Sequence, residues 1–352
     1  MKKNFCAWFV LVSVLTAILS APLFAQENAL VFSEPEKVWD AGNHNAFTDI
    51  IRFNGEFFLT FREGTGHVPE STTGVGDGTV RILRSHDGHT WKSAALLRRD
   101  GFDLRDAKLS ITPDGRLLVT MGGSIYVNGK LTGRVPQVSF SDKNGENFSD
   151  PADAFIDESI RTEFDWLWRV TWNAGVGYGV VYQITPDENA NSDWKIYLVK
   201  TTDGIHYSKC AALDVLGKPN EATVRFAPDG SMRILVRREA SDRHAFMGKS
   251  AEPFTQWEWT DTGESLGGPN FLFLPDGTCF GGGRVRGKTG LGIFTDDGIF
   301  RPLVILPTSG DNSYPGFALL DDTLLVSYYS SHEGKTSIYL TRIKLDAIQN
   351  AQ

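Results

Sequence analysis

The segment 219–238 places two charged side chains at similar distances from one turn. Glu221 lies eight residues before Asp229, and Arg237 lies seven residues after Gly230. The Pro-Asp-Gly sequence supplies the left-handed dihedral angles of a tight turn, and the apolar runs on both sides have β-strand character. Because antiparallel strands bring their outer ends side by side, we expect a hairpin with a carboxylate and a guanidinium at one end.

Arginine recurs at the same position in three such hairpins. The residue seven positions after the turn glycine is Arg62, Arg237 or Arg284. Clustered guanidinium groups offer bidentate donors that suit a carboxylate or a sulfate. We therefore expect these arginines to converge on one anion-binding cavity, the alternative being that each pairs with a nearby acidic residue.

Asp106 is a further candidate because it stands eight residues before Asp114, the offset that Glu221 has in its own hairpin. At that position its carboxylate could face the same cavity and bind sugar hydroxyls. Pairing with Arg105 or Lys108 is the alternative.

The elements that must position these residues are short strands joined by tight turns. Hairpin turns between apolar runs recur at intervals of roughly 45 to 60 residues, whereas no stretch keeps an apolar period of 3.6 residues. The turns are Asn54-Gly55, Asp114-Gly115, Ala174-Gly175, Asp229-Gly230, Asp276-Gly277 and Asp321-Asp322. Six units with about four strands each predict an all-β fold, a six-bladed β-propeller, whose inner strands surround one axis.

A second motif recurs between these hairpins. It reads SHDGHTW from Ser85, DKNGENF from Asp142, TTDGIHY from Thr201 and DDGIF from Asp296. It resembles the Asp-box of the sialidase (neuraminidase) superfamily, in a form one residue shorter. In that family the box is a structural turn between the outer strands of a blade. The resemblance therefore implies structural roles for Asp87, Asn144, Asp203 and Asp297.

The same resemblance extends over nearly the whole chain after its first 25 residues and assigns catalytic roles. Glu221 and Arg237 match the acid and the arginine that open and close the fourth-blade hairpin of sialidases. The segment NSYPGFALLDD resembles the one that carries the sialidase nucleophile, which places that role on Tyr314. The loop and strand GDGTVRILRSHDG match the region of the acid/base aspartate, which places that role on Asp77.

These three roles are chemically consistent. A phenol has a reference pKa near 10, so Tyr314 needs a base within hydrogen-bond reach, and Glu221 is the candidate. A neutral tyrosine avoids the repulsion that a carboxylate nucleophile would feel from an anionic sugar. Asp77 would protonate the leaving oxygen and then activate water, and the reaction needs no cofactor or metal.

The first hairpin departs from the family pattern. Sialidases begin this blade with Phe/Tyr-Arg-Ile-Pro, in which the arginine binds the substrate carboxylate, but the matching stretch here is Phe-Thr-Asp-Ile with Thr48 in the arginine position. Arg62 or Arg169 could replace that arginine. Another acidic sugar, or a sugar without a carboxylate, is therefore an alternative to sialic acid.

Four aromatic side chains are weaker candidates. His44 and His67 lie near the first hairpin and could contact substrate, although surface histidines are common. Trp166 and Trp168 could form a platform for a sugar ring, and packing between blades is the alternative.

The N-terminal segment and the composition of the chain predict where the protein is located and which partners it does not bind. Residues 1–25 combine a basic start, an apolar run and a small residue before the expected cleavage point, which predicts a signal peptide, a propeller domain over residues 26–352, and a secreted or periplasmic protein. No later stretch is apolar enough to span a membrane. The net charge of −8 argues against nucleic-acid binding through a basic surface.

The sequence thus predicts a secreted glycoside hydrolase similar to exo-sialidases, which cleaves a terminal and acidic sugar from glycans. Two alternatives remain open at this point. One is a glycan-binding propeller without catalysis, and the other is a polysaccharide lyase that cuts uronic-acid glycans by β-elimination.

Overall fold

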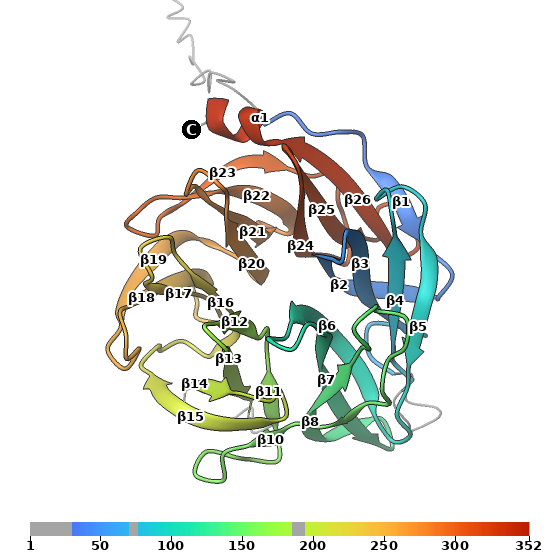
Figure 1. The fold of residues 1–352 in the computed structure, drawn as a ribbon, viewed down its shortest axis with the longest axis vertical. Helices are drawn as coiled ribbons and strands as arrows, with labels where there is room; N and C mark the ends of the chain where they lie inside the picture. The colour runs from blue at the N-terminus through green and yellow to red at the C-terminus, as the bar shows by residue number, and fades with distance from the viewer. Residues whose placement is uncertain (1–29, 70–76, 185–193, 352) are drawn as a thin grey trace, which may run out of the picture.

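Six antiparallel sheets stand around a central axis in the computed structural model of the protein (Figure 1). The structure describes residues 30–69, 77–184 and 194–351. The predicted signal peptide at residues 1–25 lies outside this range. The predicted all-β, six-bladed propeller is confirmed.

Each blade runs outward from an innermost strand at the axis. Blade 1 contains β2 (His44–Phe53), β3 (Glu56–Gly64), β4 (Thr79–Ser85) and β5 (Lys92–Leu97). Blade 2 contains β6 (Asp103–Ile111), β7 (Leu117–Val127), β8 (Lys130–Phe140) and β9 (Ala152–Asp153). Blade 3 contains β11 (Asp165–Leu167), β12 (Thr171–Asn173), β13 (Val176–Gln183), β14 (Lys195–Thr201), β15 (His206–Leu213) and, parallel to β15, β10 (Phe155–Ile156).

The other three blades complete the ring. Blade 4 contains β16 (Pro219–Phe226), β17 (Met232–Arg238), β18 (His244–Ser250) and β19 (Glu258–Ser265). Blade 5 contains β20 (Gly267–Phe273), β21 (Cys279–Val285), β22 (Lys288–Phe294) and β23 (Phe300–Ile305). Blade 6 contains β24 (Asn312–Leu320), β25 (Thr323–Ser330), β26 (Ser337–Lys344) and β1 (Glu36–Trp39), and the helix α1 (Leu345–Asn350) follows.

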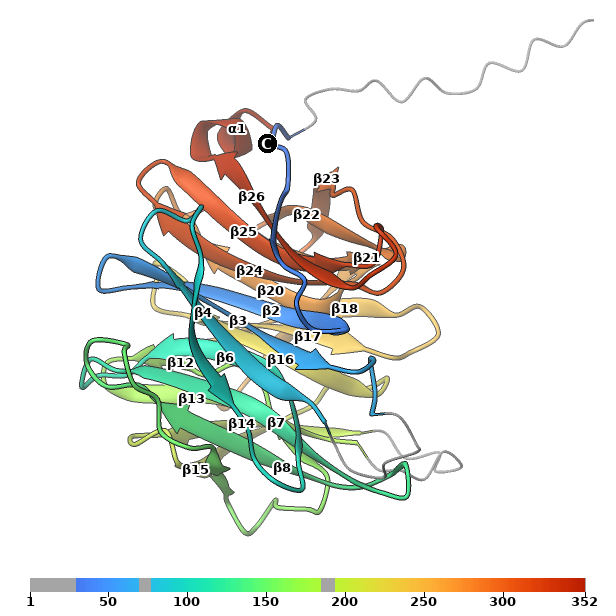
Figure 2. The ribbon, with the colours of Figure 1, turned by 90° about the vertical axis from the view of Figure 1, so that its right-hand side faces the viewer.

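The ring closes where β1 pairs with β26, so that the first strand of the chain forms the outer edge of the last blade. Figure 2 shows this N-terminal segment beside β26. Just before β1, the Ser33 N–H donates to the Arg342 carbonyl at 2.8 Å. An ion pair between Arg342 and Glu36, at 2.7 Å, joins the same two segments. Hydrogen bonds between strands from the two ends of the described chain therefore hold the propeller shut.

All six predicted hairpin turns join an innermost strand to the second strand of its blade. The turns use left-handed backbone angles, for example a φ of 51° at Asn54 and of 82° at Gly55. Asn and Gly tolerate these angles better than other residues do, which is why the turns were visible in the sequence.

The second repeated motif forms turns between the third and outermost strands. In blade 1 the Asp87 carboxylate accepts the N–H groups of His89 and Thr90 at 2.8 and 2.7 Å. In blade 2 the expected residue, Asn144, does not accept these bonds. Asp142 holds that turn instead, and it accepts the N–H of Asn144 itself at 3.0 Å.

The innermost strands are all interrupted at the same end. In blades 1, 2, 4, 5 and 6 the pairing register shifts by a β-bulge, and in blade 3 the strand is divided into β11 and β12. Three of the bulges hold a residue other than glycine at a left-handed φ, namely Phe47 (66°), Asp106 (54°) and Tyr314 (55°). Such angles are costly for these residue types and occur most often at functional sites.

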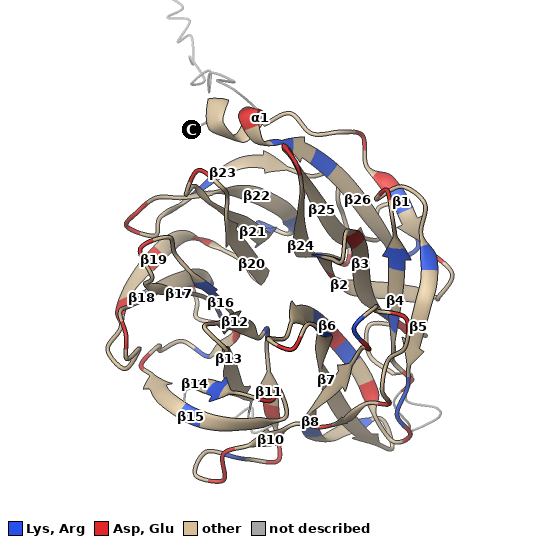
Figure 3. Cartoon of the chain, in the orientation of Figure 1, with Lys and Arg blue, Asp and Glu red and all other residues tan. Residues whose placement is uncertain are grey.

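Apolar side chains fill the space between neighbouring blades, and in β3 the rings of Phe57, Phe58 and Phe61 are completely buried. Charged residues occupy the outer loops and also some inner strands such as β6 (Figure 3). None of the helices in the described part of the chain is long and apolar enough to cross a membrane. The charged residues on the inner strands are therefore the polar groups that lie within an otherwise apolar ring.

Candidate active site

Tyr314 and Glu221 meet near the axis from two blades, 6 and 4, that are separated only by blade 5. The Tyr314 hydroxyl, on β24, donates a hydrogen bond of 2.5 Å to Oε1 of Glu221, on β16. The two side chains are 6% exposed each, so only a small part of either faces solvent. The structure thus brings together the nucleophile and the base that the sequence predicted as a pair.

The second oxygen of Glu221 is also occupied. Oε2 accepts hydrogen bonds from Arg237 Nη1 at 3.0 Å and from the Gly268 N–H at 2.9 Å. Burial would raise the pKa of Glu221, but the charge of Arg237 and these hydrogen bonds outweigh burial and hold the pKa below its ordinary value. Glu221 is therefore ionised at neutral pH and can accept a proton.

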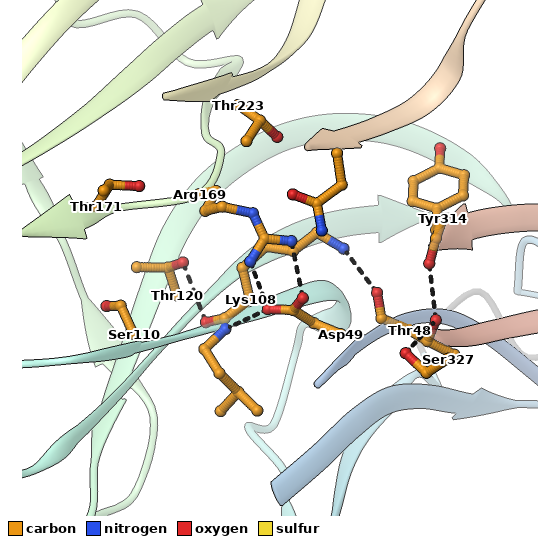
Figure 4. A network of polar contacts seen from close by, with 12 residues as sticks. Thr48, Asp49, Lys108, Ser110, Thr120, Arg169, Thr171, Thr223, Tyr314 and Ser327 are labelled. Atoms are coloured by element: carbon orange, nitrogen blue, oxygen red, sulfur yellow. Dashed lines mark hydrogen bonds and ion pairs between the residues drawn. The ribbon is translucent and has the colours of Figure 1, made fainter. Parts of the chain in front are cut away.

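Tyr314 is held rigidly. Its carbonyl oxygen accepts a hydrogen bond of 2.7 Å from the Thr48 hydroxyl (Figure 4). Its ring packs against Phe47 at 5.1 Å and Trp168 at 6.0 Å between centroids. Burial, together with the charge of Glu221, raises the pKa of Tyr314 well above its ordinary value. Thr48, which stands where sialidases carry an arginine, thus fixes the backbone of the candidate nucleophile.

Asp106 lies in the bulge of β6. Its side chain is 8% exposed, and Oδ1 accepts no hydrogen bond from any described residue. Burial and, to a smaller extent, repulsion from Glu221 raise the pKa of Asp106 to about 6, even though the charge of Lys108 acts in the opposite direction. The site therefore contains two carboxyl groups whose pKa values are shifted in opposite directions, downward for Glu221 and upward for Asp106.

Figure 4 shows Lys108 close to the pair Asp49–Arg169. Arg169 binds both oxygens of Asp49, at 2.7 and 2.8 Å, and is 4% exposed. The Lys108 ammonium lies 4.9 Å from the Trp168 ring centroid and 5.4 Å from that of Tyr314. The sequence analysis offered Arg169 as a substrate ligand, but both of its Nη atoms bind a buried carboxylate of the protein, which leaves only the buried Nε without a partner among the described residues.

Arg62 is engaged in the same way. The completely buried guanidinium donates to both oxygens of Asp103, at 3.1 and 2.6 Å, and to the Gly66 carbonyl at 2.7 Å. It also donates to Oδ1 of Asp77 at 3.2 Å, and the other oxygen of Asp77 accepts the Thr65 N–H at 2.9 Å. Arg62 therefore joins blades 1 and 2 and is not open to a substrate anion, and Asp77 is bound into the same network.

Two other arginines are available to an anion. The Arg284 side chain on β21 forms no hydrogen bond or ion pair with a described residue, and its charge acts on Tyr329 next to the site. Arg134 on β8 lies 5.3 Å from the Trp166 ring centroid, and its buried Nε and Nη1 find no acceptor among the described residues. The sequence analysis missed Arg134 because it stands on a third strand, away from the hairpin ends that were compared.

Arg237 holds an intermediate position. Besides Glu221 it pairs with Glu239 at 2.7 Å, and about a quarter of its side chain, 25%, is exposed. The three arginines at equivalent hairpin positions therefore differ. Arg284 has no side-chain partner among the described residues, Arg237 pairs with the candidate base, and Arg62 is buried against Asp103.

Three residues beside Phe47 could hold a metal ion. Oδ2 of Asp311 lies 2.9 Å from His44 Nε2 and 2.7 Å from His67 Nδ1, and the three ligand atoms lie within 4.8 Å of one another. Oδ1 of Asp311 accepts the Tyr329 hydroxyl at 3.0 Å. Burial works against ionisation of Asp311, yet hydrogen bonds from the two histidines keep its pKa below the ordinary value. Without an ion, the same geometry is a hydrogen-bonded group that fixes His67 at the mouth of the ring.

Both candidate platform residues are buried, Trp166 to 4% exposure and Trp168 to 1%. Trp166 stacks on Tyr182, with ring centroids 6.1 Å apart. These two side chains therefore pack around the axis and do not form an open platform for a sugar ring.

The propeller is similar to several solved structures. A protein of unknown function from Dyadobacter fermentans is 20% identical over 90% of this chain and 99% of that chain, with a TM-score of 0.75. An α-L-arabinofuranosidase from Fusarium graminearum, in complex with an iminosugar inhibitor, is 15% identical over 90% and 99%, with a TM-score of 0.68. A sialidase from Trypanosoma rangeli, in complex with sialic acid, is 14% identical over 94% and 59%, with a TM-score of 0.66.

No model of a known protein family matches the chain, and no curated protein sequence matches it. At these identities the structural similarity shows the propeller fold. Two of the three neighbours described above are glycoside hydrolases by name.

Proposed function

We propose that the protein is a glycoside hydrolase that releases a terminal, acidic sugar from a glycan with Tyr314 as its nucleophile. The observation that carries this proposal is the 2.5 Å hydrogen bond from the Tyr314 hydroxyl to Glu221 at the axis of the ring. A buried phenol in direct contact with an ionised carboxylate has the arrangement that an activated nucleophile requires.

In the first step the Tyr314 oxygen attacks the anomeric carbon while its proton passes to Glu221. Because the pKa of Tyr314 is raised, the phenol stays neutral until the new bond forms, and a neutral nucleophile does not repel an anionic sugar. Arg237 and the Gly268 N–H hold Glu221 in place, so the base accepts the proton without moving.

Arg134 and Arg284 are the donors that we assign to the acidic group of the substrate. Each carries a guanidinium without an acceptor among the described residues, and a sugar carboxylate supplies the matching pair of oxygens. Arg62 and Arg169 do not take part, because Asp103 and Asp49 already bind them.

The test uses residues 26–352 with fluorogenic α-sialosides, β-glucuronides, β-galacturonides and, in view of the neighbour from Fusarium, α-L-arabinofuranosides. Tyr314→Phe removes only the nucleophilic oxygen. We expect turnover of an acidic glycoside by the wild type and no detectable turnover by the variant.

Tyr328→Phe is the matched control. Tyr328 is completely buried two strands from the same axis, and its hydroxyl has no partner among the described residues, so its loss should leave turnover unchanged. Full activity of Tyr314→Phe would refute the mechanism. A product that absorbs in the ultraviolet as an unsaturated uronide would indicate a lyase, and binding without any product would indicate a glycan-binding propeller.

A further inference from the structure

Asp106 occupies a strained position whose counterpart in blade 6 is Tyr314. Both residues sit in the bulge of an innermost strand, with φ angles of 54° and 55°, and both are almost completely buried. The fold thus holds a residue in this strained backbone conformation at two places, and both face the same axis. A carboxyl group placed in this way, with Oδ1 lacking a partner among the described residues, has an oxygen available for a ligand.

The groups around Asp106 come from several blades. Lys108 and Arg105 on its own strand and His67 above β6 supply positive charge, while Glu221 from blade 4 repels its ionised form. Asp106 in turn acts electrostatically on Tyr314, Tyr182, Tyr329 and Arg134. Asp106 therefore shares one electrostatic environment with the candidate nucleophile, its base and a candidate anion ligand.

Asp77 is placed differently. Arg62 donates to one of its oxygens and the Thr65 N–H to the other, and both hydrogen bonds stabilise the ionised form of Asp77 and not the protonated form that a general acid needs. Arg62 in turn is fixed by Asp103. Through these two hydrogen bonds Asp77 holds the backbone of Thr65 next to Arg62.

We infer that Asp106, and not Asp77, is the acid/base residue that exchanges protons with the leaving oxygen and with water. This inference rests on the proposed function. It assigns the second proton transfer of that reaction to a residue that the sequence analysis expected to bind sugar hydroxyls.

The two steps balance as follows. Tyr314 forms a bond to the anomeric carbon and gives its proton to Glu221, while the bond from that carbon to the leaving oxygen breaks and this oxygen takes the Asp106 proton. In the second step water attacks the same carbon and gives a proton to Asp106. The bond to Tyr314 breaks, and the phenolate recovers its proton from Glu221.

A specific pH dependence follows. Asp106 must be protonated at the start, so kcat/KM should fall as the pH rises through about 6. Glu221 must be ionised, so kcat/KM should also fall as the pH drops through its lowered pKa. The Asp106→Asn variant should lose the alkaline decline and keep the acidic one.

The experiment compares Asp106→Asn with Asp77→Asn on 4-nitrophenyl and methyl glycosides of the sugars named above. Asparagine tolerates a left-handed φ, so the first variant keeps the bulge. For Asp106→Asn we expect turnover of methyl glycosides to fall by roughly 10²- to 10⁴-fold. The 4-nitrophenyl glycosides need little protonation and should lose less, and sodium azide should restore turnover and yield a glycosyl azide. For Asp77→Asn we expect neither leaving-group dependence nor rescue.

Two results would overturn the inference. One is azide rescue of Asp77→Asn in place of Asp106→Asn, and the other is an equal loss on both leaving groups without rescue. In either case Tyr314→Phe still reports separately on the proposed function.

A measurement without substrate separates the two proposals further. In protein labelled with carbon-13 at the aspartate carboxyls, the signal that disappears in Asp106→Asn should titrate near pH 6. A midpoint near the ordinary value of about 4 contradicts the assignment, whether or not the protein turns over a glycoside.

Discussion

Three carboxyl groups near the axis differ in their hydrogen-bond partners and, as a result, in their protonation. Glu221 has a cation and a backbone N–H on one oxygen, and these keep it ionised. Asp49 is bound on both oxygens by Arg169, which leaves it a structural role. Asp106 has an oxygen without a partner among the described residues, and its raised pKa follows from burial. Partners, and not residue type, therefore decide which acid is suited to proton transfer.

Arg134 offers a residue-scale prediction about substrate charge. Replacing Arg134 with alanine should raise KM for acidic glycosides by roughly 10- to 100-fold, because a charge-assisted pair of hydrogen bonds is lost. Neutral arabinofuranosides should be affected little. The melting temperature should fall only modestly, since the variant loses the packing of the guanidinium on Trp166 but no hydrogen bond from the buried Nε or Nη1 to a described residue.

Arg301→Ala is the control for that prediction, because Arg301 is an exposed residue on the outer strand β23. Steady-state kinetics on a β-glucuronide and an α-L-arabinofuranoside would decide the matter. An equal loss on both substrates would show that Arg134 supports the site without recognising charge.

At the scale of single residues, the sequence predicted some contacts and could not predict others. It predicted that Tyr314 and Glu221 come together, because the resemblance assigned the nucleophile to Tyr314 and a phenol needs a base within hydrogen-bond reach, and the structure places them in contact. It could not predict that Arg62 and Arg169 are occupied. Their partners Asp103 and Asp49 stand on innermost strands of other blades, so only the packing of the blades brings each pair together.

Among the elements, the bulges of the innermost strands are the feature with most consequence for the site. They hold Phe47, Asp106 and Tyr314 at left-handed φ angles. The sequence gives no warning of them, since none of the three is a glycine or an asparagine. The hairpin turns were all predicted, and five of the six carry a glycine, the exception being Asp321-Asp322.

The blade 5 bulge leads to an element-scale prediction. Gly268 has a φ of +63°, and a Cβ added there would lie 2.5 Å from Cγ and Cδ2 of Tyr314. Gly268→Ala should therefore displace the Tyr314 ring from Glu221 and lower kcat by roughly 10²-fold or more. Kinetics on the best glycoside of the panel, with melting temperatures alongside, would test this.

Gly287→Ala provides the comparison for Gly268→Ala. Gly287 has a similar φ of +85°, but a Cβ added there would meet nothing within 4 Å. It should cost stability through backbone strain alone, roughly 1–2 kcal/mol, and leave kcat intact. Equal kcat values for the two variants would show that Tyr314 does not depend on the blade 5 bulge.

At the scale of the whole molecule, the repeat of turns predicted the number of blades, and the structure agrees. That β1 joins blade 6 could not be predicted, because a strand of four residues has little pattern of its own. That pairing depends on contacts between the two ends of the described chain, which no local signal reports.

Removal of β1 tests the importance of ring closure. A chain of residues 41–352 lacks β1 and the Glu36–Arg342 ion pair, and it exposes the edge of β26. We expect its melting temperature to lie at least about 5 °C below that of a chain starting at residue 29, which keeps the strand. Identical melting curves from circular dichroism would mean that blade 6 is stable with three strands.

Closure also governs when the candidate site comes into being. Asp106, Glu221 and Tyr314 belong to blades 2, 4 and 6, so every second blade contributes one of them. A growing chain acquires the last of the three only with its final blade, whose outer strand was the first to be made. A fragment that lacks the final blade lacks Tyr314 and cannot assemble the candidate site. The three residues come together only when the ring closes.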